Sequence, residues 1–336
     1  MPSRPAAPRH EPVVRRRHAR LVTAAAAAVL AAGCGSSAAS SISAPRVEKP
    51  NLTVAVVPAT SVAGLYIAQQ RGYFAQAGLH VKITPVASGV NALPELVRGA
   101  IDIDEGQWTS DVAAEAKGVA QLHVLAPGNS GGTALEQVVV APNSPIRRVP
   151  ELRGKTIAVN ALKGLAVLLT SNVLSSFGVN PASVHFVVTP FPAMAAAVAT
   201  HRVDAAFITE PFLSAAMDGQ GLVPLFDIDQ GAAQDFPIAG YVSTRAWASK
   251  YPRAASAFVR ALTRGQRVAA TDRTAVQQAL EKALHISKVT AATMALGTYP
   301  LVMTRVELAR VASLMQLNGL LSTSVNAKRL VNGMVR

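Results

Sequence analysis

The sequence predicts an α/β protein built from two units that are joined by two extended crossings. Short β-branched segments alternate with amphipathic helical segments over residues 52–127, and the same rhythm restarts over residues 155–209. Two further extended segments, at about residues 136–142 and 239–245, connect the units. Strands alternating with helices at this spacing predict a doubly wound parallel sheet in each unit, and a double-stranded hinge implies a cleft that can close over a solute.

The first unit opens with a strand at residues 52–57 that stops at Pro58. Thr60 or Ser61 is expected to cap a helix that runs to Gln70 and ends at Gly72. The elements that follow are expected in the order strand, helix, strand, helix and strand, at residues 79–86, 91–98, 101–104, 109–117 and 121–127.

The second unit is expected to repeat this order, with strands at residues 155–160, 184–190 and 203–209 and helices at 165–178, 192–201 and from Pro211 onward. A strand at residues 240–247 crosses back, and the chain beyond it is predicted to be helical. Thr304 and Glu307 form a capping box for one of these helices, which is expected to stop at Gly319.

Composition narrows the class of protein. Of the 336 residues, 50% are hydrophobic and 15% are charged, so the chain can bury a core and is not a disordered protein. No apolar run reaches the roughly 18 residues of a membrane-spanning helix, which excludes an integral transporter. The single cysteine excludes a disulfide framework, and no two of the seven histidines have metal-ligand spacing on one element, so no metal and no cofactor are predicted.

The net charge of +13 is concentrated in residues 241–336, which hold fourteen basic and three acidic side chains. Few aromatic residues are interleaved with these charges, and nucleic-acid binding is therefore not expected. The simplest interpretation is a solvated helical face, and the alternative is attraction to anionic lipid or to a membrane partner.

The first residues have the pattern of an export signal. Arginines at positions 15–17 and 20 precede an uncharged apolar stretch at residues 21–32, which predicts a signal peptide over residues 1–33. Residues 30–34 resemble the lipobox of bacterial lipoproteins, and this resemblance implies that Cys34 carries a lipid. Residues 34–50 are Ser-, Ala- and Pro-rich and are predicted to form a flexible tether to the extracytoplasmic face of the membrane.

Several short motifs occur in a fixed order along the body of the chain, among them LYIAQQRGYF (65–74), LVRGAIDI (96–103), ELRGKTIAV (151–159) and HRVDAAFITEPF (201–212). Together they resemble the extracytoplasmic solute-binding proteins of ABC importers, in the group that binds nitrate, taurine, aliphatic sulfonates or thiamine pyrimidine precursors. The resemblance implies a two-lobed periplasmic-binding-protein fold (venus-flytrap, type II), a membrane permease as partner, and a monomer that makes or breaks no bond.

On this interpretation lobe 1 comprises residues 51–138 plus 243–336, and lobe 2 comprises residues 139–242. The favoured solute is a sulfonate- or taurine-like oxyanion, and a thiamine pyrimidine precursor or another nitrogen heterocycle is the alternative. A ligand-sensing lipoprotein and an extracytoplasmic hydrolase are two further alternatives. A hydrolase would need a nucleophile with a base beside it, and the sequence offers no such pair.

Candidate contacts in the first unit follow the ends of its strands, where ligands bind in open α/β sheets. Thr60 and Ser61 are expected either to donate to an oxyanion or simply to cap their helix. Gln107 and Trp108 follow the third strand, and Trp108 is expected either to cover the solute or to pack in the core.

Other candidates lie near the crossings and in the second unit. Asn129 and Ser130 form a polar loop near the hinge that formally matches G-x-S-x-G but lacks the helix of a nucleophile elbow. Asn160 and Lys163 open a helix in the second unit and are expected to hold an anionic head group. Glu210 is expected either to pair with a cationic group or to sit at a helix N-terminus.

Overall fold

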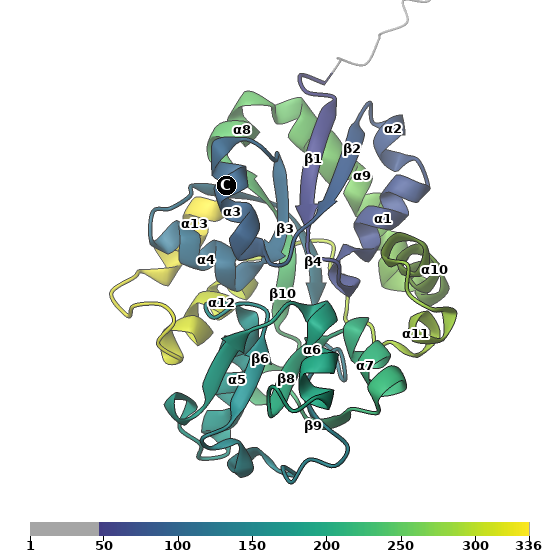
Figure 1. The fold of residues 1–336 in the computed structure, drawn as a ribbon. Coiled ribbons are helices and arrows are strands. Elements are labelled where there is room, and N and C mark those ends of the chain that lie inside the picture. The colour runs from purple at the N-terminus through teal and green to yellow at the C-terminus, as the bar shows by residue number, and fades with distance from the viewer. Residues whose placement is uncertain (1–46, 336) are drawn as a thin grey trace, which may run out of the picture. The chain divides into compact units, whose positions relative to one another are not determined.

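Two five-stranded sheets organise residues 47–335, the part of the chain that this computed structural model describes (Figure 1). The first sheet has the order β2-β1-β3-β10-β4, formed by β1 (Asn51–Val56), β2 (His80–Pro85), β3 (Ile103–Gln107), β4 (Leu122–Ser130) and β10 (Pro237–Thr244). The second has the order β7-β6-β8-β5-β9, formed by β5 (Glu136–Val140), β6 (Thr156–Val159), β7 (His185–Val188), β8 (Ala205–Thr209) and β9 (Val223–Asp227). The predicted signal peptide and Cys34 lie outside the described residues.

Both sheets are mixed, whereas the sequence predicted parallel ones. The β1–β2 and β1–β3 pairs are parallel, as are β6–β7 and β6–β8. The strand that crosses into each sheet runs the other way: β10 is antiparallel to β3 and β4, and β5 is antiparallel to β8 and β9. The prediction failed because it treated the crossings as connectors, although each crossing strand inserts into a sheet and completes its hydrogen bonding.

Helices cover both faces of the first sheet (Figure 1). One face packs against α1 (Ala63–Gln70), α9 (Pro252–Thr271) and α10 (Arg273–Leu284), and the other against α3 (Gly89–Arg98) and α4 (Trp108–Ala116). Beside α1 lies a short helix, α2 (Tyr73–Gln76), where the sequence predicted only the end of a helix. We call this sheet with its helices lobe 1. It includes β10 and therefore residues 237–242, which the predicted boundary assigned to lobe 2, whereas β5, from Glu136, belongs to the second sheet although the predicted boundary lay after residue 138.

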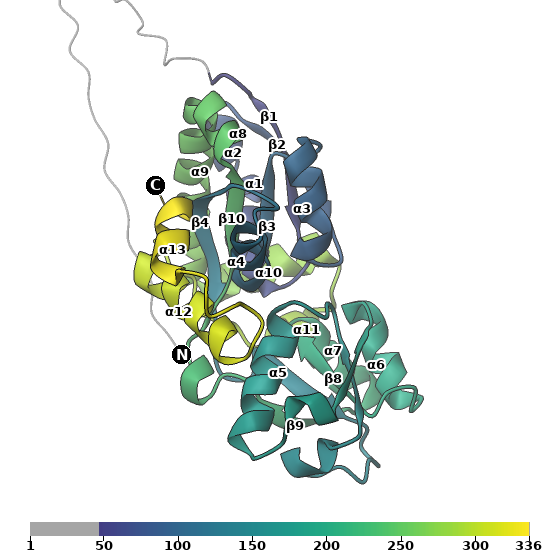
Figure 2. The ribbon, with the colours of Figure 1, turned by 90° about the vertical axis from the view of Figure 1, so that its left-hand side faces the viewer.

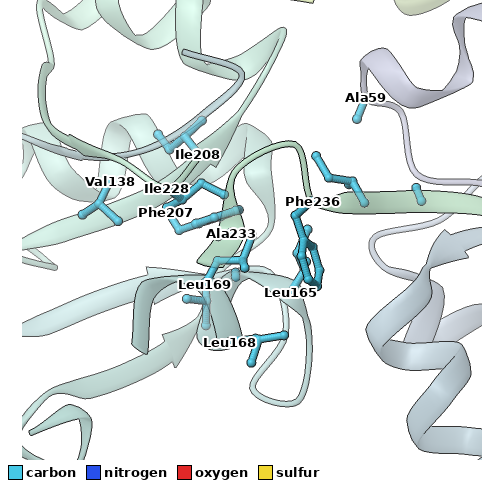
Figure 3. Packing of buried hydrophobic residues seen from close by; sticks show 14 of the residues in the cluster. Ala59, Val138, Leu165, Leu168, Leu169, Phe207, Ile208, Ile228, Ala233 and Phe236 are labelled. Carbon is cyan, nitrogen blue, oxygen red and sulfur yellow. The ribbon is translucent and has the colours of Figure 1, made fainter. Parts of the chain in front are cut away.

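The second sheet carries α5 (Leu165–Ser176), α6 (Phe191–Ala199) and α7 (Phe212–Gln220), and we call this assembly lobe 2. Figure 3 shows its core, where strand residues Val138 and Phe207 and the α5 residues Leu168 and Leu169 converge with Phe236. Phe236 belongs to the segment that leads back into β10, so the return crossing is anchored in the lobe 2 core.

The chain after β10 is helical, as predicted, and it reaches both lobes. Short helix α8 (Arg245–Lys250) leads into α9, and α11 (Lys288–Thr293) contacts α7 of lobe 2. The last helices, α12 (Arg305–Leu317) and α13 (Ala327–Met334), pack against α4 beside the first sheet (Figure 2).

Local signals explain where several elements begin. The capping box of α12 is confirmed, because Glu307 N donates to Thr304 Oγ1 at 3.1 Å and Thr304 N donates to the Glu307 carboxylate at 2.7 Å. Strand β10 ends at Thr244, earlier than predicted, because the Thr244 hydroxyl caps α8 by accepting from Trp247 N. The predicted cap at Thr60 or Ser61 is wrong, since a 3₁₀ turn at Thr60–Val62 precedes α1 and neither side chain makes a cap hydrogen bond.

Within residues 47–335, none of the helices combines the length and apolar character that crossing a membrane requires.

Candidate functional site

A small cavity of about 20 Å³ lies between the two lobes. Its polar lining consists of Thr60, Ser61, Glu105, Gln107, Asn129, Glu136 and Thr209, and its apolar lining includes Val57, Ala59, Phe191, Ile238 and Ala239. A volume of this size holds roughly one water molecule. A larger solute therefore enters only if the lobes move apart and then close around it.

The fold gathers these side chains because both sheets direct strand ends toward the cavity. Glu105 and Gln107 come from the end of β3, Asn129 comes from the end of β4, and Thr209 is the last residue of β8. Glu136 is the first residue of β5, directly after the outward crossing. This is the position at which open α/β sheets bind ligands.

Glu105 is fully buried on the lobe 1 side of the cavity. Its Oε2 accepts from Val57 N at 3.3 Å, and its Oε1 has no hydrogen-bond partner among residues 47–335. Burial raises the pKa of Glu105 to about 8, and the Ser61 side chain and Val57 amide offset part of that rise.

Glu136 faces the same cavity from lobe 2 and is 3% exposed. Burial, together with the nearby carboxylates of Asp227 and Asp229, raises the pKa of Glu136 to about 8, whereas the Thr209 side chain lowers it in part. Its Oε2 also lacks a hydrogen-bond partner within the described chain. Each lobe therefore presents one buried carboxyl group with a free oxygen.

Two amide side chains complete the polar lining. Gln107 Oε1 accepts from Leu165 N at 3.4 Å, so a residue of β3 bonds directly to the first residue of α5 across the cleft. Asn129 is 3% exposed, and its Oδ1 finds no donor in the described part of the protein. A buried oxygen without a donor is unfavourable, so a solute that donates hydrogen bonds would stabilise it.

A second pair of acids lies behind Glu105. The carboxylates of Asp104 and Asp111 both lie over the Cα of Gly106, where a Cβ would be 3.0 Å from Asp104 Oδ2 and 3.6 Å from Asp111 Oδ1. Burial raises the pKa of Asp104 well above its usual range, and the charges of Asp111 and Glu105 raise it further. No group of three or more His, Cys, Asp or Glu side chains able to hold a metal occurs in residues 47–335.

Four of the residues predicted from the sequence line the cavity: Thr60, Ser61, Gln107 and Asn129. Trp108 does not. It is fully buried inside lobe 1, and its ring packs so closely on Gly240 that no side chain would fit there. Its position matches the core-packing alternative.

The other predicted residues lie outside the cavity lining. Ser130 pairs through its backbone with Thr298 and does not line the cavity. Asn160 is buried at the end of β6, and Lys163 is exposed. Glu210 accepts from Ser214 N at 3.0 Å, from Ser214 Oγ at 2.7 Å and from Ala295 N at 3.1 Å, which matches the helix-terminus alternative.

Sequence reasoning did not select Glu105, Glu136, Thr209 or Phe191 as solute contacts. Phe191 opens α6 after β7 and stacks on Phe212, with ring centroids 5.6 Å apart. The rule that ligands meet strand ends would have found Thr209 and Phe191, because Thr209 ends one predicted strand and Phe191 directly follows another. Glu136 was not predicted because it is the first residue of a crossing strand, and the crossing strands were interpreted only as a hinge.

Comparison with known proteins agrees with this architecture. A family model described as NMT1/THI5 like matches residues 59–275, which is more than half of the chain. No curated protein matches the sequence.

Solved structures with the same fold are numerous. The alkanesulfonate-binding protein SsuA from Xanthomonas axonopodis pv. citri, bound to MOPS, is 21% identical, with a TM-score of 0.71 over 84% of this chain and 98% of its own. The periplasmic nitrate-binding protein NrtA from Synechocystis is 17% identical, with a TM-score of 0.73 over 87% of each chain. A Candida albicans protein described as having the generic periplasmic binding protein fold is 18% identical, with a TM-score of 0.72 over 85% of this chain and 96% of its own.

These likenesses show that the two lobes form a periplasmic-binding-protein fold, and the match to the family model shows that the chain belongs to the NMT1/THI5-like family.

Proposed function

We propose that this protein is the solute-binding component of an ABC importer. The observation that carries the proposal is the cavity between the lobes, to which both sheets contribute buried polar side chains. A site divided in this way binds its solute best when the lobes are closed, so the solute stabilises the closed form, which the permease would recognise. The similar alkanesulfonate- and nitrate-binding proteins support this role by analogy of fold.

The protein would act on the extracytoplasmic face of the membrane, anchored through a lipid on Cys34. This part of the proposal depends on the sequence pattern of residues 1–50. As part of this proposal, the protein acts as a monomer.

Two solute classes follow from the sequence, and the lining discriminates between them. An oxyanion needs donors, and the hydroxyls of Thr60 and Ser61 can supply them. The ionisable side chains in the lining, however, are the two glutamates, with no Lys or Arg among the described lining residues. The lining therefore favours the nitrogenous solute, which was the alternative, over the sulfonate- or taurine-like solute.

The role can be tested by solute capture. The purified full-length chain would be incubated with a small-molecule extract of bacteria, washed and denatured, and the released solutes quantified by mass spectrometry. We expect one solute at close to one molecule per chain, together with a smaller radius of gyration in solution scattering when it is bound. Absence of any retained solute would contradict the proposal.

A pair of threonine substitutions controls this experiment. Thr209→Trp fills the cavity from the end of β8 and should abolish capture, whereas Thr200→Trp changes an exposed threonine outside the cavity and should not. Melting curves would verify that both variants fold. If Thr209→Trp does not fold, the smaller substitution Thr209→Leu would replace it.

A further inference from the structure

The cavity has an unusual balance of charge. Its lining contains two buried carboxyl groups, Glu105 from lobe 1 and Glu136 from lobe 2, and no described lining residue is a cation. None of the ion pairs within residues 47–335 involves either glutamate. A buried ionised carboxylate without a partner is strongly unfavourable, so closing the lobes over two of them requires a compensating charge or protons.

The free hydrogen-bonding atoms at the cavity point to the same need. Glu105 Oε1, Glu136 Oε2 and Asn129 Oδ1 are buried acceptors for which the described residues provide no donor. They come from β3, β5 and β4, so they approach the cavity from both lobes. A group that donates several hydrogen bonds in different directions would satisfy all three, and a protonated nitrogen does so with a positive charge.

The surroundings of the cavity also favour a cation. Asp104 and Asp111 lie behind Glu105, and they too are buried acids that form no ion pair within the described residues. Phe191 lines the cavity from lobe 2, and an aromatic ring attracts a cation placed near its face. The small volume restricts the group that sits between the glutamates to the size of an ammonium or amidinium head.

We propose that Glu105 and Glu136 hold the protonated nitrogen of a small cationic solute, an amine or an amidine, between the two lobes. The inference rests on the proposed function, since it names the solute class of that site. The positive charge pairs with one carboxylate from each lobe and so stabilises the closed form. Without this charge, the two acids disfavour the closed form. The solute class thus differs from the anions named for the similar sulfonate- and nitrate-binding proteins.

Calorimetric titration tests this inference with four defined probes. Methylammonium and acetamidinium represent the cations, and ethanesulfonate and nitrate represent the anions. We expect the cations to bind the full-length chain and the anions not to bind. Glu105→Gln and Glu136→Gln keep the side-chain shape and remove the charge, so each should weaken cation binding by about tenfold or more. Lys163→Ala, which lies outside the cavity, is the control variant and should leave the affinity for the cations unchanged.

Proton exchange during binding provides a readout that does not depend on these variants. A cation lowers the pKa of Glu105 and Glu136, so binding at pH 7 should release protons, which appear as a dependence of the heat on the ionisation enthalpy of the buffer. Binding of an oxyanion by the protonated acids would instead be accompanied by proton uptake by the protein. The other groups that face Glu105 are Tyr66, Asp104, Asp111 and Tyr241, and those that face Glu136 are Asp227 and Asp229.

The outcomes separate this inference from the proposed function. Binding of ethanesulfonate or nitrate with proton uptake, and no binding of the cations, would overturn the inference and leave solute capture intact. Failure of both cations to bind at millimolar concentration also overturns it, whatever solute the capture experiment returns. Failure of capture itself would count against the proposed function.

Discussion

Glu105 and Glu210 are buried acids in comparable regions of the two lobes, yet the structure uses them differently. Each lobe contains a β-α-β-α-β run; Glu105 lies within the third strand of the run in lobe 1, β3, and Glu210 directly follows the third strand of the run in lobe 2, β8. Both glutamates are buried. From the sequence alone, both are acids that follow a strand and precede a helix.

Their hydrogen bonds distinguish them. Glu210 accepts three hydrogen bonds, from the amide and hydroxyl of Ser214 at the start of α7 and from the amide of Ala295. Glu105 accepts one long hydrogen bond from Val57 N and lies beside the Ser61 side chain, and its Oε1 has no hydrogen-bond partner among the described residues. A buried carboxylate whose oxygens both accept hydrogen bonds from the protein has a structural role, whereas one with an unpaired oxygen is available to a ligand. Its place after a strand does not distinguish the two roles.

The largest effect expected from this comparison is a gain in stability on removing the Glu105 charge. The pKa of Glu105 is raised from 4.5 to about 8 in the folded protein, so the stability of the solute-free protein is full below pH 4.5 and falls as the pH rises toward 8. At pH 9, Glu105→Gln should therefore increase the free energy of unfolding by on the order of 3 kcal/mol. Urea unfolding at pH 5 and pH 9 measures this change.

The pH dependence is the internal control for that prediction. At pH 5 the wild-type carboxyl is largely protonated in the folded protein, and the variant and wild type should have similar stability. A gain of the same size at both pH values would show that packing, and not charge, is responsible. A loss at pH 9 would show that Glu105 is stabilised as a charged group.

The same substitution at Glu210 should act in the opposite direction. Glu210→Gln places an NH₂ group against at least one of the donors of Ser214 and Ala295, which leaves buried donors facing each other. We expect a loss of about 1–2 kcal/mol in the free energy of unfolding near neutral pH. Solute affinity of the folded variant should change by less than about threefold. A large loss of affinity without a loss of stability would place Glu210 in the binding site and remove the distinction.

The sequence predicted the order of the strands and helices well but the site less well. Alternating strands and helices depend on local periodicity, which the sequence carries, and the capping box at Thr304 and Glu307 depends on two residues three apart. The antiparallel insertion of β5 and β10 depends on pairing between distant segments, which periodicity does not encode.

The prediction of site residues was incomplete for the same reason. Trp108 follows a strand as a cleft residue would, but its ring packs on Gly240, which is more than a hundred residues away. Glu136 reaches the cavity only because β5 enters the second sheet at that residue. Position after a strand was therefore enough to predict Gln107 and Asn129, and tertiary pairing was needed for Glu136.

A smaller effect is expected at the contact that joins the lobes beside Glu105. Gln107→Ala removes the 3.4 Å hydrogen bond between Gln107 Oε1 and Leu165 N without removing a charge. Because this bond is long and neutral, its loss should weaken the closed form by about 0.5–1 kcal/mol, or about two- to fivefold in solute affinity. Calorimetry with the captured solute measures this loss of affinity. A loss as large as that caused by Glu105→Gln would show that the contacts between the lobes contribute as much to solute affinity as the charge of Glu105 does.

The smallest effect, and the sharpest for solute class, is expected at Lys163. Its side chain is exposed and does not line the cavity, although its place before α5 made it a candidate for an anionic head group. If the glutamates bind a cation, Lys163→Ala should leave solute affinity within about twofold, because an exposed charge outside the site is screened by water and salt. A tenfold loss of affinity that grows at low salt would instead mean that the solute is an anion and that the two buried acids bind it in their protonated form.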